Sequence, residues 1–270
     1  MRAKILYVTD LTYPARGRRY GDEDTFLTRQ LRDNFDLAIC HPLDAVALMD
    51  SFDAVVVRNS GPVLHFQVEY DEFRAAAIDR GTRVFNQLTG KADMVGKQYL
   101  VELNDAGSPV IPTTDSDPSS LPEASGYLVK PKLGSDSIGL RKVTREELTT
   151  LSLDGLLAQP LIDFRYEVSF YFVDRDFQYA LYTPDPEHRW ELDPYEPTDE
   201  DLAFAQRFVD WNAIDHGIQR VDACRTRSGE LLLVELEDLN PFLSLSHTDD
   251  TSRSAFVKRM ASSLGTLLDL

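Results

Sequence analysis

The sequence predicts a mixed α/β and α+β protein, in which an N-terminal parallel layer is followed by two antiparallel regions. Strand-like and helix-like segments alternate over the first third of the chain, which is typical of a parallel sheet covered by helices. Beyond residue 127 most strand-like segments are joined by short turns, which favours antiparallel pairing. With 270 residues, of which 43% are hydrophobic, the chain can bury a substantial core.

The N-terminal layer contains short apolar runs and two segments with helical spacing of apolar residues. We expect strands at 4–8, 35–40, 54–58 and 82–86, and helices at 22–34 and 68–80. Ligands of such sheets bind beyond the carboxyl ends of the strands, which makes Arg58, Asn59 and Ser60 candidates for substrate binding. The loop 12–24 adds Arg16, Arg18 and Arg19, as an anion-binding loop or as an ordinary cationic surface loop.

The pattern changes after the segment Gly107-Ser-Pro-Val-Ile-Pro112, where glycine and proline interrupt regular structure. We expect the later strands at 127–130, 138–143, 166–173, 177–183, 219–225 and 231–236, and the later helices at 96–106, 145–150, 198–212 and 252–268. We place the domain boundaries so that the chain divides into residues 1–88, 89–160 and 161–270.

Composition excludes several classes of function. Lys plus Arg number 28 and Asp plus Glu 45, which gives a net charge of −17 and argues against nucleic-acid or anionic-membrane partners. Two distant cysteines, Cys40 and Cys224, give no disulfide framework, so we expect a cytoplasmic protein. No run approaches the ~20 apolar residues of a membrane span.

The segment 219–242 concentrates acidic residues on a predicted hairpin. A two-residue turn at Ser228-Gly229 would place Asp222 opposite Glu235 and Arg220 opposite Glu237, all on one face. Three converging carboxylates with one arginine need a further counter-charge, and a hard divalent cation would supply it. The alternatives are a solvent-facing hairpin end with ordinary charge pairs, or a three-residue turn that shifts the register by one and separates the acids.

Two further segments suit a nucleotide. Lys130 ends an apolar strand, and the following loop holds Ser135 and Ser137 among glycines, so its backbone N–H groups could cover phosphate oxygens. The extended segment Gln159-Pro160-Leu161-Ile162 could offer backbone groups to an adenine edge, and Glu167 could accept from a ribose hydroxyl. A mobile surface hairpin and an ordinary strand start are the alternatives for the two segments.

In their order and spacing these segments resemble the ATP-grasp superfamily of carboxylate–amine ligases, in the glutathione-synthetase-like and ribosomal-protein glutamate-ligase-like branch. The resemblance runs from about Asn86 to the end. It implies a pre-ATP-grasp domain at 1–88, a small ATP-binding subdomain at 89–160 and a large subdomain with a metal site at 161–270. It also implies roles for Lys97 and Lys130 on the phosphates, Ser135 and Ser137 in the phosphate loop, Gln159, Pro160 and Leu161 at the adenine, Glu167 on the ribose, and Asp222, Glu235 and Glu237 or Asn240 on Mg²⁺.

Two positions depart from the family pattern. The family usually ends its metal motif with Glu-x-Asn, whereas this chain has Glu235-x-Glu237 with Asn240 three residues later, so either Glu237 or Asn240 could be the next ligand. Gln159 stands where an acid is common. The Glu-x-Glu ending is similar to a smaller group that includes a D-cycloserine-forming ligase, which hints at specialised metabolism.

The resemblance implies an ATP-dependent ligase that needs Mg²⁺, or Mn²⁺ in its place. It would activate an amino-acid-like carboxylate as an acylphosphate and join it to an amine, with Arg220 and Lys130 as catalytic residues. A catalytically silent ATP-binding regulatory module and a kinase-like phosphotransferase are the alternatives. We expect small-molecule carboxylate and amine partners and allow for a homodimer. The candidate substrate contacts are Arg16, Arg19, Arg58, Asn59, Ser60 and Arg189, with Arg165 and His247 as further candidates, and Cys224 is expected to be a packing residue.

Overall fold

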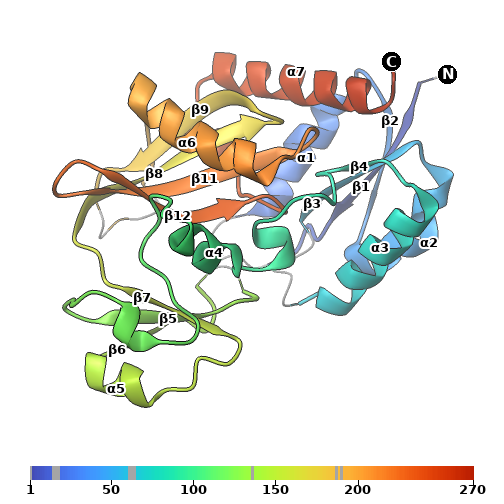
Figure 1. Cartoon of the computed structure of the whole chain (residues 1–270). Coiled ribbons are helices and arrows are strands. Elements are labelled where there is room, and N and C mark those ends of the chain that lie inside the picture. The colour runs from blue at the N-terminus through green and yellow to red at the C-terminus, as the bar shows by residue number, and fades with distance from the viewer. Residues whose placement is uncertain (1, 14–18, 60–64, 135–136, 186–187, 189–190) are drawn as a thin grey trace.

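The described part of the chain forms three sheets (Figure 1). The computed structural model describes residues 2–13, 19–59, 65–134, 137–185, 188 and 191–270. The predicted site residues Arg16, Ser60, Ser135 and Arg189 lie outside this part of the chain, as does the side chain of Asn59. No helix in the described ranges is long and apolar enough to cross a membrane.

The N-terminal sheet is parallel, with strand order β2-β1-β3-β4. Its strands are β1 (Lys4–Thr9), β2 (Asp36–Cys40), β3 (Ala54–Asn59) and β4 (Val84–Phe85), and its helices are α1 (Tyr20–Leu31), α2 (Ala45–Leu48) and α3 (Gln67–Arg80). Leu27 and Leu31 of α1 pack on one face, and Phe73 and Ala77 of α3 pack on the other. Both faces are therefore buried, which explains why the central strands are continuously apolar.

The largest sheet is antiparallel, with order β10-β9-β8-β11-β12. Its strands are β8 (Phe164–Val173), β9 (Asp176–Thr183), β10 (Asp193–Pro194), β11 (Ile218–Thr226) and β12 (Leu231–Glu237). The helices α4 (Tyr99–Asp105) and α6 (Asp199–Asn212) pack against one face in a shared apolar cluster. The opposite face packs in part against the C-terminal helix, and the rest of it borders the candidate site.

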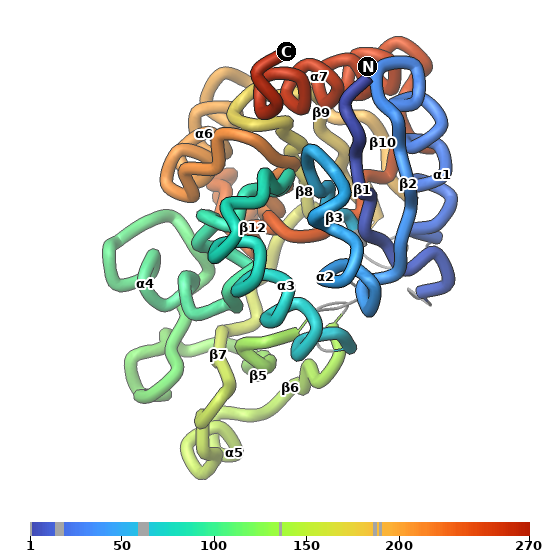
Figure 2. Tube along the Cα trace, turned by 90° about the vertical axis from the view of Figure 1, so that its right-hand side faces the viewer, coloured from blue at the N-terminus to red at the C-terminus, as the bar shows by residue number. Residues whose placement is uncertain are grey.

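The C-terminal helix α7 (Asp250–Leu267) joins this sheet to the N-terminal layer. Its buried residues Phe256, Met260 and Leu264 share one apolar cluster with Tyr7 of β1 and Tyr171 of β8. Figure 2 shows α7 running across the end of the molecule where both termini lie. The two sheets are thus fixed to each other by packing as well as by the chain connection.

The third sheet is small and projects from the other two (Figure 1). It has the order β6-β5-β7, from β5 (Tyr127–Pro131), β6 (Arg141–Val143) and β7 (Leu156–Pro160), with α5 (Arg145–Thr150) beside it. Thr144 and Glu147 close the start of α5 in a reciprocal capping box. A separate small core, which includes Tyr127 and Leu148, holds this unit together.

Most predicted elements are present, with three differences. Residues 156–160 form a regular strand that we did not expect, because each pairs with a residue of β5, and this strand takes in Gln159 and Pro160 of the extended segment 159–162. β6 starts at Arg141 rather than at 138. Tyr99 and Leu100, which we assigned to the domain at 89–160, pack in the core of the largest sheet. The domain boundaries themselves stay a prediction.

If α7 fixes the two sheets together, loss of its central ring should be costly. Phe256 is fully buried and contacts Tyr179 edge-to-face at 5.9 Å between ring centroids. We expect Phe256→Ala to lower the free energy of unfolding by about 3–5 kcal/mol, measured by urea denaturation. Ile78→Ala, on the exposed side of α3, is the control and should change it by less than about 0.5 kcal/mol. A loss below about 1 kcal/mol for Phe256→Ala would contradict this role of α7.

Candidate functional site

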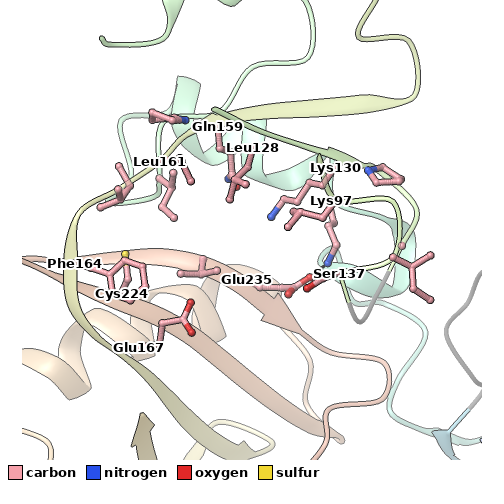
Figure 3. A pocket seen from close by; sticks show the side chains of 18 of the residues that line it. Lys97, Leu128, Lys130, Ser137, Gln159, Leu161, Phe164, Glu167, Cys224 and Glu235 are labelled. Carbon is pink, nitrogen blue, oxygen red and sulfur yellow. Dashed lines mark ion pairs between the residues drawn. The ribbon is translucent and has the colours of Figure 1, made fainter. Parts of the chain in front are cut away.

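A cavity of about 390 Å³ lies between the small sheet and the largest sheet (Figure 3). Every residue predicted to bind nucleotide, Ser135 apart, lines it. These residues are Lys97, Lys130, Ser137, Gln159, Pro160, Leu161 and Glu167. Lys130 points into the cavity from β5, and Glu167 faces it from β8 on the opposite side (Figure 3). Residues from three separate segments therefore meet in one concave site.

The end of the cavity near β7 has a defined hydrogen-bonding pattern. Gln159 is buried, and its side-chain amide donates to the Thr113 hydroxyl at 2.8 Å. Pro160 has no N–H, and the N–H of Leu161 donates to the Gly126 carbonyl at 2.9 Å. In the extended segment 159–162, the next residue after Leu161 is Ile162, which also lines the cavity. Among the described residues its N–H has no backbone acceptor.

Cys224 differs from the prediction. We expected a packing residue, but its side chain faces the cavity near Phe164 and Glu167 (Figure 3). Cys224 lies on the face of Asp222, because side chains alternate along β11 and the bulge lies on the other strand. Burial raises the pKa of this thiol to about 12, so the thiol is protonated near neutral pH and adds an apolar surface to the cavity.

The two lysines at the other end of the cavity are held differently. Lys97 is buried and forms ion pairs with Glu235 and, at 2.6 Å, with Asp93. Within the described part of the chain, the Lys130 ammonium has neither a hydrogen bond nor an ion pair. Burial and the neighbouring Lys97 lower the pKa of Lys130 to about 7. An anion entering the cavity would therefore meet one partnered and one unpartnered lysine.

Close packing holds Lys97 against the small sheet. Its backbone N–H donates to the Lys132 carbonyl at 2.8 Å. Gly96 has φ +97°, and a Cβ there would lie 2.7 Å from the Leu133 side chain. Only glycine meets both conditions without strain.

The acidic hairpin has the predicted pairing but a different turn. Asp222 lies opposite Glu235 and Arg220 opposite Glu237, as expected. The turn holds three residues rather than two, since the N–H of Thr226 bonds the Glu230 carbonyl and Gly229 has φ +102°. That turn alone would shift the register by one.

A β-bulge restores the register. Ala223 pairs with Leu233 while Asp222 pairs with Glu235, so Val234 is the extra residue. The bulge also corrects the assignment of faces near the turn. Leu231 and Leu233, which strict alternation from Glu235 would place beside the acids, lie in the core with Leu236.

The carboxylates of Asp222, Glu235 and Glu237 come together as predicted. One ligand oxygen from each lies within 4.8 Å of the other two, and all three side chains are half-buried. They border a second cavity of about 360 Å³ that adjoins the first, since Ser137, Glu167, Val234 and Glu235 line both. Asn240 lies in the segment after β12, so Glu237 is the residue that shares the hairpin face with the other two acids.

Arg220 is the counter-charge built into this cluster. Its Nε and Nη2 bind the Asp222 carboxylate at 2.8 and 2.7 Å, Nη2 also contacts Glu237 at 2.6 Å, and Nη1 donates to the Phe242 carbonyl at 2.8 Å. Burial raises the pKa of Glu237 to about 7, against the opposing effect of Arg220 and with the added repulsion of Asp222. The cluster thus carries more negative charge than its own cation offsets.

Most of the predicted substrate-binding residues that the structure describes do not line either cavity. Arg58 is 1% exposed and forms an ion pair with Asp24 at 3.3 Å, so it lies in the interior and lines neither cavity, contrary to our expectation. Arg19 is exposed beside Asp22. Arg165 donates to the Arg227 carbonyl at the hairpin turn. His247 does line the second cavity.

Several residues of the second cavity were missed. They are Ser169, Tyr171, Thr183, Phe242 and Ser244. Ser169 and Tyr171 alternate with Glu167 along β8, so the period of two could have indicated them once Glu167 was chosen. Ser244, at φ +53°, carries no such signal.

The fold and these cavities can be compared with known proteins. No protein-family model and no curated protein sequence matches the chain. Among solved structures, the D-cycloserine synthetase DcsG matches with a TM-score of 0.75 and 21% identity over 98% of this chain and 99% of that chain. The ATP-grasp ligase PsnB, solved with a minimal precursor, matches with a TM-score of 0.66 and 16% identity over 98% and 100%. The D-alanine–D-alanine ligase of Bacillus anthracis, solved with ATP, matches with a TM-score of 0.67 and 11% identity over 99% and 96%. The chain therefore has the ATP-grasp fold, as its motifs predicted.

The contrast between the two lysines can be tested without any ligand. Lys97→Met leaves Asp93 and Glu235 without their cation and should lower the free energy of unfolding by about 1–3 kcal/mol. Lys130→Met removes a half-buried amine whose pKa is lowered, and should be neutral or stabilising by up to about 2 kcal/mol at pH 7.

The lowered pKa of Lys130 also predicts how the free energy of unfolding changes with pH. The folded pKa of Lys130 is about 7 and its unfolded pKa is near 10, so the wild-type protein should gain stability as pH rises through this range. The advantage of Lys130→Met should shrink over the same range. Urea titrations at several pH values measure both variants, and equal destabilisation by the two would contradict the assignment.

Proposed function

We propose that this protein is an ATP- and Mg²⁺-dependent carboxylate–amine ligase that activates its acid substrate as an acylphosphate. One observation carries the proposal: Asp222, Glu235 and Glu237 converge where the two cavities meet, with Lys97 on one side and Arg220 on the other. For phosphoryl transfer, the triphosphate in one cavity and the substrate carboxylate in the other would have to meet where the cavities adjoin. The similarity to structures of ATP-grasp ligases supports the same conclusion.

The first cavity would hold ATP. The carbonyl of Pro160 and the N–H of Ile162 would read the adenine edge, since the N–H of Leu161 is already bonded within the chain. Glu167 would accept from the ribose. Lys97 and Lys130 would bind phosphate oxygens, and a triphosphate would supply the anionic partner that Lys130 otherwise lacks.

The acidic cluster fits a hard divalent cation. Its donors are carboxylate oxygens, which Mg²⁺ and Mn²⁺ prefer, and their summed charge exceeds that of Arg220. When bound, the cation would neutralise charge on the phosphates during transfer. Asp222, Glu235 and Glu237 would hold it, with Glu237 favoured over Asn240 because it shares the hairpin face with the other two.

The second cavity would hold the substrate carboxylate in line with the γ-phosphate. A carboxylate oxygen attacks the γ-phosphorus, the bond to the β-phosphate oxygen breaks, and ADP and an acylphosphate result. Arg220 would stabilise the developing charge, because its guanidinium is already fixed by two carboxylates and a carbonyl. An amine then attacks the acyl carbon, an amide forms, and phosphate leaves with the proton released to solvent. The walls around this cavity would exclude water from the acylphosphate.

Two other functions fit the fold and differ in their products. A silent regulatory module would bind MgATP but release no ADP with any acid and amine. A kinase-like phosphotransferase would release ADP and a stable phosphate ester. Mass spectrometry of the product, in an ADP-release screen of amino acids and small carboxylic acids with and without amines, separates all three. If calorimetry with Mg²⁺ detected no ATP binding, the ligase and both alternatives would fail together.

The role of Arg220 predicts a kinetic signature. Arg220→Lys keeps the charge but loses the paired contact to Asp222, so we expect kcat to fall about 10²–10³-fold. The Kd of MgATP should stay within about threefold of wild type, since Arg220 does not line the first cavity. Arg80→Gln, at an exposed pair with Asp50, is the control. An Arg220→Lys enzyme with wild-type kcat would contradict the role.

The position of Glu237 predicts a pH dependence of metal binding. Its pKa is about 7, so a proton competes with the metal below pH 7 and the affinity for Mg²⁺ should fall as pH falls from 7 to 6. Calorimetry in buffers of different ionisation enthalpy should detect proton release on Mg²⁺ binding. Glu237→Gln should bind Mg²⁺ about tenfold more weakly and release fewer protons. An unchanged affinity in this variant would favour Asn240 as the ligand.

A further inference from the structure

The segment 241–247 forms one wall of the second cavity. Phe242, Ser244 and His247 from this segment all line it. The segment follows β12 and contains only one short 3₁₀ turn, Leu245–His247, so a strand or helix ladder does not hold most of its backbone. Ser244 adopts φ +53°, which a non-glycine residue keeps only when its surroundings fix it. The position of this wall must therefore come from contacts with other parts of the chain.

Two buried charged residues of the N-terminal layer make several of those contacts, beside the Tyr179 hydroxyl, which donates to the Leu243 carbonyl at 2.7 Å. Glu23 of α1 accepts the backbone N–H of Leu243 at 2.9 Å with one carboxylate oxygen and that of Leu245 at 3.1 Å with the other. Arg58 of β3 donates from Nη1 to the Pro241 carbonyl at 3.0 Å. These hydrogen bonds go to backbone groups of the segment, so they do not depend on which side chains the segment carries.

The same segment is tied to the proposed transfer site from the other direction. Arg220 donates to the Phe242 carbonyl at 2.8 Å, between the residues held by Arg58 and Glu23. Along the backbone, the carbonyls of Pro241 and Phe242 and the N–H groups of Leu243 and Leu245 are thus bound in turn by Arg58, Arg220 and Glu23. A shift of this segment would move the group that orients Arg220.

Glu23 and Arg58 are themselves held in place by burial and by charged neighbours. Arg58 is 1% exposed and Glu23 is 8% exposed, with Nη2 of Arg58 3.7 Å from the Glu23 carboxylate. Asp24 holds Arg58 from the other side at 3.3 Å, and Asp24 in turn accepts from the Tyr7 hydroxyl at 2.8 Å. Burying such charges is a poor route to stability, because apolar residues would fill the same space at lower cost. What the charges add is direction toward backbone groups.

We propose that Glu23 and Arg58 are positioning residues of this enzyme, through which the N-terminal domain sets the wall of the acid-substrate cavity and the orientation of Arg220. Neither residue lines either cavity, so they act through the segment 241–245 and not on the substrate directly. The catalytic consequence rests on the proposed ligase function, whereas the positioning itself does not. The effect should reach the acid substrate and leave ATP binding unchanged.

Amide hydrogen exchange tests the positioning in the protein without ligands. Glu23→Gln replaces one accepting oxygen by a donor, and Arg58→Lys keeps the charge but shortens the reach to Pro241. We expect exchange in peptides that cover residues 241–248 to rise at least about tenfold in Glu23→Gln, while exchange in α6 stays at the wild-type rate. Arg83→Gln is the control, because it breaks an exposed pair between the N-terminal domain and Asp269 without touching the segment.

Unchanged exchange at 241–248 in both Glu23→Gln and Arg58→Lys would overturn the proposal. So would an equal rise in α6, because it would mean that the variants loosen the whole protein. Circular dichroism confirms that each variant is folded before exchange is measured. Arg58→Lys provides the second reading if Glu23→Gln fails this check.

Kinetics test the consequence separately. MgATP, hydroxylamine and a mixed pool of L- and D-amino acids are the probes, and hydroxamate formation reports acylphosphate. We expect Glu23→Gln to raise the apparent KM for the acid pool about tenfold with the KM for MgATP unchanged, and Arg83→Gln to match wild type. An unchanged KM for the acids in a variant with altered exchange would overturn the link to catalysis. If wild type forms no hydroxamate while the exchange result holds, the ligase proposal loses its support and the positioning role stands.

Discussion

Oxygen atoms from three carboxylates on the β11–β12 hairpin lie within 4.8 Å of one another. Their mutual repulsion has to be offset by neighbouring cations, and the other charged groups of the site do this. Their convergence depends on the register of one strand pair. A three-residue turn would displace Asp222 from Glu235, and the extra residue Val234 returns them to opposite positions. Because side chains alternate along a strand, a single bulge decides whether the acids face the cavity or the core.

Two basic residues supply the counter-charges of the three acids. Lys97 pairs with Glu235, and Arg220 pairs with Asp222 and Glu237, so each acid has a cationic neighbour. If Lys97 turns from Glu235 toward a phosphate, a cation must take its place beside that carboxylate. Nucleotide and metal would then bind in a coupled way, each removing the cost that the other creates.

Local signals in the sequence were enough to predict most elements of the fold. Helical spacing located the long helices α1, α3, α6 and α7, and alternation located the strands of the largest sheet. The strand at 156–160 was not predicted, because only the segment 159–162 was interpreted as extended and pairing with β5, which is a tertiary contact, makes 156–160 a strand. The bulge at Val234 could not be predicted, since nothing in the run Leu231-Leu-Leu-Val-Glu235 marks one position as extra.

The site was predictable where chemistry is carried by adjacent charged residues, as in the hairpin. It was not predictable where a charge is used inside the protein. Arg58 follows an apolar run, as a ligand-binding arginine would. It nevertheless lies in the interior, where it pairs with Glu23 and Asp24 of α1. Whether an arginine meets a substrate or a buried carboxylate depends on contacts between distant segments.

A crystal structure with Mg²⁺ and a non-hydrolysable ATP analogue tests the central claim most directly. The account predicts a cation bound by Asp222, Glu235 and Glu237 at about 2.0–2.1 Å. It also predicts that the Lys97 ammonium moves from Glu235 to a phosphate oxygen, while Lys130 contacts the same triphosphate. A cation held elsewhere, or a nucleotide outside the cavity with Lys97 still paired to Glu235, would contradict the account.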